Sequence, residues 1–274
     1  DQVGAHLGGG LIAVVRILRQ GLEHHGIQCR GQVQVRIALR RWDRVFPDVL
    51  VGDRNWGVAD EWRVPGEDLV EHTAQRIHVR AGVDSLAAGL VHLGIEAGDR
   101  VGIWAPNCVE WCLTQFATAR IGAIMVCLNP AYRLYELEYA LNKVQCKALI
   151  TAARFKSSDY LGMLQTLAPE LARAAPGQLD SHKLPHLKTV IRLGDDESAG
   201  MFNFGALRRA PNAADRTRLA AIAATLEPTD AINIQFTSGT TGNPKGATLS
   251  HRNILNNGKI VGDGMRLGAH DRLC

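Results

Sequence analysis

Lysine is absent from the first half of this 274-residue chain, and its first occurrence is Lys143. Arginine is frequent there instead. The tryptophans at positions 42, 56 and 62 are scattered among Gly, Asp and Arg without a helical or strand period. Because no folded element can be assigned to such a stretch, we expect residues 1–82 to be an unassigned leader, from a displaced reading frame or an unrelated sequence.

Paired cysteine motifs are also missing. The chain has six cysteines without a CxxC pair, which argues against a disulfide framework. Cys108 and Cys112 lie one helical turn apart beside Trp111, but no histidine nearby would complete a metal site. We therefore expect these two cysteines to pack in the core, and we predict no metal site.

Long apolar runs and a clustered basic stripe are absent as well. The apolar run at residues 10–18 is too short to span a membrane. With no Lys or Arg before it and no cleavage pattern after it, an incidental run is favoured over a targeting peptide. The net charge of +4 is spread along the chain. We predict no integral membrane segment and no nucleic-acid partner.

From residue 83 onward, strand-like and helix-period segments alternate. This order predicts an α/β fold with helices packed on a largely parallel sheet. The expected strands are 101–104, 123–128, 147–151, 189–193, 232–236 and 246–249, and the expected helices are 106–120, 134–143, 158–167, 215–226 and 253–261. Residues 168–185 and 194–212 hold Pro, Gly and charge, so we expect surface insertions there.

One loop between two of these strands has the composition of a phosphate-binding loop. Glycines at 239, 242 and 246 would permit positive φ and bring backbone N–H groups close to an anion. The hydroxyls add neutral donors, and a lysine stiffened by the preceding proline adds a mobile positive charge. The predicted phosphate-binding residues are Thr237, Ser238, Gly239, Thr240, Thr241, Gly242, Asn243, Pro244 and Lys245.

This loop has two alternative interpretations. The P-loop of NTPases needs a Gly-Lys-Ser/Thr ending, whereas here Lys245 precedes Gly246 and Ala247, so that motif does not match. A Ser/Thr/Gly surface loop without a ligand is the simpler alternative. A lysine framed by Pro and Gly after so many hydroxyls favours phosphate binding.

Histidines offer few further candidates. His182 and His186 have a metal-like spacing, but Pro185 between them argues against a shared helical face, so exposed loop histidines are favoured. His251 follows the phosphate loop at the start of a helix that Ser250 or His251 could cap. A structural role for His251 is favoured over ligand contact.

The segment from Phe236 to Gly246 resembles the phosphate-binding signature of the adenylate-forming enzymes, the superfamily of acyl-CoA synthetases, luciferases and nonribosomal adenylation domains. Further signatures of that superfamily are resembled in the expected order by residues 84–90, 94–101, 105–107, 129–133 and 136–139. Residues 129–151 and 232–273 are most similar to medium-chain acyl-CoA synthetases of the acyl-CoA synthetase family member 2 type. The resemblance covers residues 83–274.

The resemblance implies an ATP-dependent ligase that joins a fatty acid to CoA through an acyl-adenylate, with ATP, Mg2+, CoA and the fatty acid as its small-molecule partners. It also implies that residues 83–274 are an incomplete portion of the large N-terminal AMP-binding domain. The superfamily's adenine-binding segment, ribose-binding aspartate and C-terminal lysine have no counterpart here, so no catalytic residue is identified.

Several alternatives remain open at this point. The acid could instead be an aryl or amino acid, or the chain could be a non-catalytic nucleotide-binding remnant. We expect the chain to be inactive on its own. We expect a cytoplasmic location, or the mitochondrial matrix in a eukaryote. The sequence carries no signal for the oligomeric state.

Overall fold

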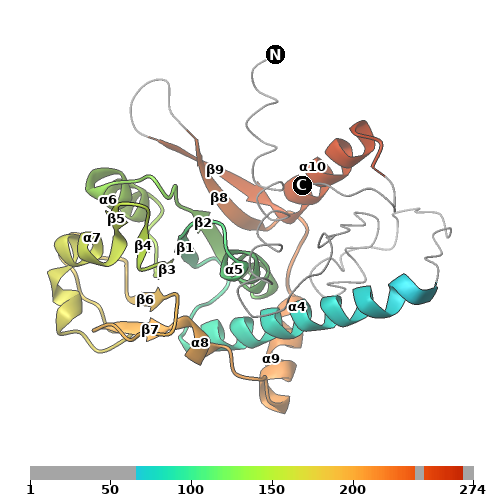
Figure 1. The fold of residues 1–274 in the computed structure, drawn as a ribbon, viewed down its shortest axis with the longest axis horizontal. Coiled ribbons are helices and arrows are strands. Elements are labelled where there is room, and N and C mark those ends of the chain that lie inside the picture. The colour runs from blue at the N-terminus through green and yellow to red at the C-terminus, as the bar shows by residue number, and fades with distance from the viewer. Residues whose placement is uncertain (1–65, 238–243, 268–274) are drawn as a thin grey trace.

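The computed structural model describes residues 66–237 and 244–267, with side chains from residue 79 onward. Within these residues, seven strands form one sheet in the order β7-β6-β3-β1-β2-β8-β9 (Figure 1). All neighbouring strands run parallel except β8 and β9, which are antiparallel. The strands are β1 Arg100–Trp104, β2 Ile124–Cys127, β3 Ala148–Thr151, β6 Thr189–Arg192, β7 Met201–Asn203, β8 Ala231–Thr237 and β9 Lys245–Ser250.

Helices cover both faces of the sheet, which confirms the predicted α/β class (Figure 1). One face packs against α4 (Gly66–His92) and α5 (Val109–Arg120), and α9 (Ala213–Ala223) packs on these two helices. The other face packs against α6 (Leu134–Lys143) and α7 (Tyr160–Leu167). The remaining elements are the hairpin β4 Arg154–Phe155 and β5 Ser158–Asp159, the 3-10 turn η2 Pro169–Ala172, α8 Phe204–Leu207 and α10 His251–Gly264.

Alternation along the strands builds the two layers of the core. In β1, Val101 and Ile103 face the α4–α5 layer, whereas Trp104 faces the α6–α7 layer. In β3, Ile150 and Leu149 divide in the same way. Because successive side chains of a strand point to opposite faces, strands covered on both sides read as continuous apolar runs.

The two segments expected to be surface insertions are in part folded into the core, which corrects that prediction. Residues 201–203 form β7, which pairs with β6 at the edge of the sheet. Phe204 is buried directly after it. In the other segment, Leu171 and Leu179 are buried against the α6–α7 layer. These elements are too short to show a period, and they are separated by Pro and Gly, so the pattern suggested loops.

Helix α4 begins at Gly66 and runs without a break across the expected boundary at residue 83. Its second half is among the most buried parts of the chain, with Leu86 and Leu90 inaccessible to solvent. Residues 1–65 lie outside the described part, including the apolar run and the scattered tryptophans. Within the described residues, no helix combines the length and the apolar character that crossing a membrane requires.

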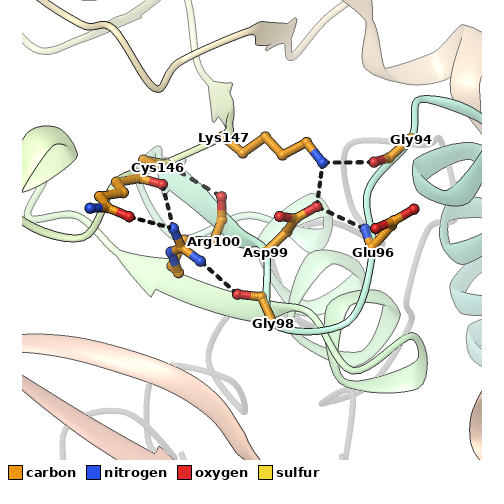
Figure 2. Close-up of polar contacts among 8 residues, drawn as sticks. Gly94, Glu96, Gly98, Asp99, Arg100, Cys146 and Lys147 are labelled. Atoms are coloured by element: carbon orange, nitrogen blue, oxygen red, sulfur yellow. Dashed lines mark hydrogen bonds and ion pairs between the residues drawn. The ribbon is translucent and has the colours of Figure 1, made fainter.

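The edge of the sheet at the amino end of β1 and β3 is held by charged side chains (Figure 2). Lys147 Nζ donates to Asp99 Oδ2 at 2.6 Å and to the carbonyl of Gly94 at 2.9 Å. The guanidinium of Arg100 donates to the carbonyls of Val144 at 2.6 Å and of Gly98 at 2.8 Å. These bonds tie the turns before β1 and β3 together, so the charges at this edge serve the fold.

Candidate functional site

The predicted phosphate loop connects β8 to β9 as an antiparallel hairpin. Thr237, the last residue of β8, pairs with Lys245, the first of β9. The Thr237 hydroxyl donates to the Lys245 carbonyl at 3.4 Å, and the Lys245 side chain is exposed. Of the predicted phosphate-binding residues the structure describes Thr237, Pro244 and Lys245, while 238–243 lie outside the described residues. The two ends of the loop are therefore fixed by strand pairing.

Gly246 has a different role from the one expected. It does not take a positive φ, and it lies in β9 directly opposite Phe236. A Cβ built at Gly246 would lie 3.1 Å from Cγ2 of Ile234 and 3.7 Å from Cε1 of Phe236. The positive φ predicted for this glycine is wrong, and what the position requires is a small residue, because a Cβ there would crowd Ile234.

Thr237 and Lys245, the described ends of the loop, lie at the carboxyl edge of the parallel sheet, where open α/β sheets bind their ligands. β8 is parallel to β2, with Gln235 opposite Cys127, so the segment that follows β2 lies beside the end of β8. Tyr132 in that segment meets Phe236 edge to face, with ring centroids 6.5 Å apart and an interplanar angle of 69°. The loop after β2 therefore contacts the β8–β9 hairpin through these two rings.

Two buried aromatic side chains hold the loop after β2 in place. Trp104 and Tyr160 stack with ring centroids 3.7 Å apart at 11°. Trp104 Nε1 donates to the Asn129 carbonyl at 3.2 Å, and the Tyr160 hydroxyl donates to the Pro130 carbonyl at 2.6 Å. The side chain of Asn129 also accepts from the Ala131 N–H at 2.9 Å. Neither Trp104 nor Tyr160 was singled out from the sequence, because their contact joins segments far apart in the chain.

The phenols at this edge stay neutral. Burial raises the pKa of Tyr160 to about 12, although the Arg133 guanidinium acts in the opposite direction. Burial, and then the charge of Glu136, also raise the pKa of Tyr132. Both hydroxyls can therefore donate hydrogen bonds at any physiological pH.

The thiols of the described region are not poised for catalysis. Burial raises the pKa of each of them to about 12, which keeps the thiol protonated: Cys108, Cys112, Cys127 and Cys146. Cys112 is buried on α5, which confirms the packing role expected for it. Cys108 directly precedes α5 and is half-buried. Nothing in these environments activates a sulfur nucleophile.

The histidines follow the structural interpretation. Ser250 caps α10, since its hydroxyl accepts from the Asn253 N–H at 3.2 Å. His251 is buried at the opposite end of the hairpin from the phosphate loop, where Ala231 pairs with Ser250. Burial lowers its pKa, against the charge of Asp230. The histidines at 182 and 186 are exposed in a loop, as expected.

Comparison with known proteins identifies the family to which this geometry belongs. Residues 77–274 match the family described as AMP-binding enzyme. The chain belongs to the AMP-binding enzyme family. The match begins within α4, six residues before the boundary expected at 83.

Relatives in the family include mitochondrial medium-chain acyl-CoA ligases ACSF2. The Danio rerio protein is 50% identical over 186 residues, covering 68% of this chain and 30% of the relative. The Homo sapiens protein is 42% identical over 210 residues, covering 75% of this chain and 34% of the relative. The chain therefore spans about a third of the length of these family members.

Among solved structures, a protein assigned as a long-chain-fatty-acid CoA ligase from Rhodopseudomonas palustris shares the fold. Its TM-score is 0.52 at 24% identity, and the match covers 70% of this chain and 42% of that structure. The α/β arrangement described above is thus that of part of an AMP-binding enzyme.

Proposed function

We propose that this chain is the phosphate-binding portion of an ATP-dependent acyl-CoA ligase. The observation that carries the proposal is the β8–β9 hairpin at the carboxyl edge of the parallel sheet, with Thr237 and Lys245 paired across the base of its hydroxyl- and glycine-rich loop. A cation and neutral donors at that position suit the β- and γ-phosphates of Mg-ATP.

The proposed reaction has two steps. A carboxylate oxygen attacks the α-phosphorus of ATP, so that a new P–O bond forms and pyrophosphate leaves with the electrons of the broken P–O bond. The CoA thiolate then attacks the acyl carbon, and AMP leaves as the thioester forms. In the first step the pyrophosphate gains charge as it departs, and the exposed ammonium of Lys245 would follow and neutralise that charge.

The substrate class is proposed from similarity. ACSF2 relatives are named medium-chain acyl-CoA ligases, and we propose a medium-chain fatty acid for this protein too. Their names also say mitochondrial, which supports the matrix as the location if the source is a eukaryote. The nearest alternative is an aryl or amino acid, which a panel of carboxylates distinguishes through the rate of pyrophosphate release.

The test uses Lys245→Met in the complete enzyme that contains this chain, with Lys183→Met as the matched control. Both lysine side chains are exposed, but Lys183 lies in the loop between α7 and β6. Loss of a charge that stabilises the departing phosphates should slow acyl-adenylate formation roughly 100-fold. Transfer to CoA from supplied acyl-AMP should change little.

Two outcomes would contradict the proposal. If Lys245→Met slowed neither step, or slowed both steps equally, the hairpin would not be the pyrophosphate site. If Mg-ATP raised the melting temperature of the complete enzyme while no carboxylate caused pyrophosphate release, the protein would be a non-catalytic nucleotide-binding remnant. For the 274-residue chain alone we expect no turnover.

A further inference from the structure

Tyr132 links the anchored loop after β2 to β8, the strand that leads into the phosphate loop. We propose that Tyr132 is a positioning residue of the nucleotide-phosphate site, acting through its edge-to-face contact with Phe236. The inference rests on the proposed function, because it assigns a role within that same site. Nothing in the composition of the phosphate loop itself points to this residue.

Tyr132 belongs to an anchored loop. The two carbonyls before it accept hydrogen bonds from buried side chains, Asn129 from Trp104 at 3.2 Å and Pro130 from Tyr160 at 2.6 Å. The Tyr132 N–H donates back to the Asn129 carbonyl at 3.0 Å. With its backbone held on both sides of the turn, the half-buried ring of Tyr132 has a defined place.

Phe236 lies beside both ends of the phosphate loop, so its position helps to fix them. Phe236 directly precedes Thr237, and its partner across the hairpin is Gly246, which directly follows Lys245. A Cβ at Gly246 would lie 3.7 Å from the Phe236 ring, so the ring rests beside the β9 backbone. Tyr132 approaches the same ring with a centroid distance of 6.5 Å.

The contact between Tyr132 and Phe236 would strengthen the binding of Mg-ATP. Side chains that are already held in place lose less conformational entropy when a ligand binds, and so they bind it more tightly. Fixing Phe236 fixes the residues from which the hydroxyl of Thr237 and the ammonium of Lys245 project. The effect belongs to the aromatic ring rather than to the phenol, whose raised pKa keeps it neutral.

The experiment measures Mg-ATP affinity calorimetrically in the complete enzyme, together with its melting temperature. The variants are Tyr132→Leu, Tyr132→Phe, Phe236→Leu and the Tyr132→Leu/Phe236→Leu pair. Tyr135→Leu is the matched control, because this tyrosine lies three positions further on and its side chain is 67% exposed. The double-mutant cycle isolates the contact between the two rings.

We expect Tyr132→Leu and Phe236→Leu each to weaken Mg-ATP binding roughly three- to tenfold, as the worth of an aromatic pair allows. The double variant should be little weaker than either single one. Tyr132→Phe should stay within about twofold of wild type, because it keeps the ring. In turnover, Tyr132→Leu should raise the KM for ATP but not the KM for the fatty acid.

The inference is overturned if Tyr132→Leu binds Mg-ATP as tightly as Tyr135→Leu does, even when its melting temperature falls, since Tyr132 would then serve only stability. Additive losses in the cycle would overturn it as well. Failure of the wild-type enzyme to bind Mg-ATP would remove the proposed function and this inference together. Tight Mg-ATP binding by all variants would leave the proposed function standing.

Discussion

Replacing Tyr160 by Phe removes one hydroxyl and leaves the stacked pair with Trp104 intact. The hydroxyl donates to the Pro130 carbonyl at 2.6 Å, and that bond is one of the anchors of the loop that carries Tyr132. The ring lies 3.7 Å from the Trp104 ring at 11°, an arrangement that Phe reproduces. The substitution therefore tests the anchor separately from the packing.

The magnitude follows from the surroundings of the two partners. A neutral hydrogen bond contributes about 1 kcal/mol net to stability, and a carbonyl left buried without a donor costs about 1–3 kcal/mol more. Pro130 is only half-buried, so water can reach its carbonyl when the phenol is gone. We expect Tyr160→Phe to lower the free energy of unfolding by about 1 kcal/mol, at the low end of the combined range.

Urea unfolding at pH 7 and pH 9 measures this change, with Tyr139→Phe on α6 as the control. Burial raises the pKa of Tyr160 to about 12, above the value of about 10 for a phenol in the unfolded chain. A group whose folded pKa is raised contributes fully below its unfolded pKa, and the contribution is lost only as the pH rises through the folded pKa. The loss should therefore be the same at both pH values.

Equal stability of Tyr160→Phe and Tyr139→Phe would refute this reasoning, because the anchor would then contribute nothing measurable. A loss at pH 7 that disappears at pH 9 would refute the assignment of a neutral donor. Mg-ATP affinity in the complete enzyme should also fall in Tyr160→Phe, by less than in Tyr132→Leu, since one of the two carbonyl anchors remains.

Two further predictions concern the hairpin and the end of α4. Gly246→Ala should destabilise the chain by about 1 kcal/mol in urea unfolding, because its Cβ would crowd Ile234. Gly264→Ala is the control and should be neutral or slightly stabilising, because its Cβ meets nothing within 4 Å. A larger loss for Gly264→Ala than for Gly246→Ala would contradict the packing. The N–H of Asn212, and then His92, lower the pKa of Asp215, so its contribution is present above the ordinary carboxyl range and lost as the pH falls through the lowered pKa. In Asp215→Asn the free energy of unfolding should therefore fall less steeply as the pH is lowered. An unchanged fall at acid pH would argue against this account.

The elements with a clear period could be predicted from sequence. Residues 134–143 combine buried Leu137 and Leu141 on one face with polar residues on the other, and the observed helix has the predicted bounds. Strand β3 was expected from its apolar run, and it is buried at every position. Strand β7 was missed because three residues carry no period, and what makes them a strand is pairing with β6.

The candidate site divides in a similar way. The composition of the loop was enough to predict a phosphate-binding loop between two strands, because its hydroxyls, glycines and lysine are local signals. The antiparallel pairing of β8 with β9 was not predicted. The aromatic supports could not be predicted, since Trp104 and Tyr160 meet only after β1 and α7 are placed on the same face. Gly246 was misinterpreted for the same reason: it must be small because of Ile234 on the neighbouring strand β8, which no local pattern reports.

The distribution of charge between the two edges of the sheet bears on how the site would work. At the amino edge, Lys147 and Asp99 neutralise each other at 2.6 Å (Figure 2). The five residues of β1 separate that edge from the carboxyl edge by about 17 Å, and two opposite charges so close together largely cancel at that range. The amino-edge pair therefore neither competes with nor assists a polyphosphate at the hairpin. Because the aromatic rings that hold the carboxyl edge near Phe236 are uncharged, they do not offset the charge of Lys245, which we propose acts on the ligand.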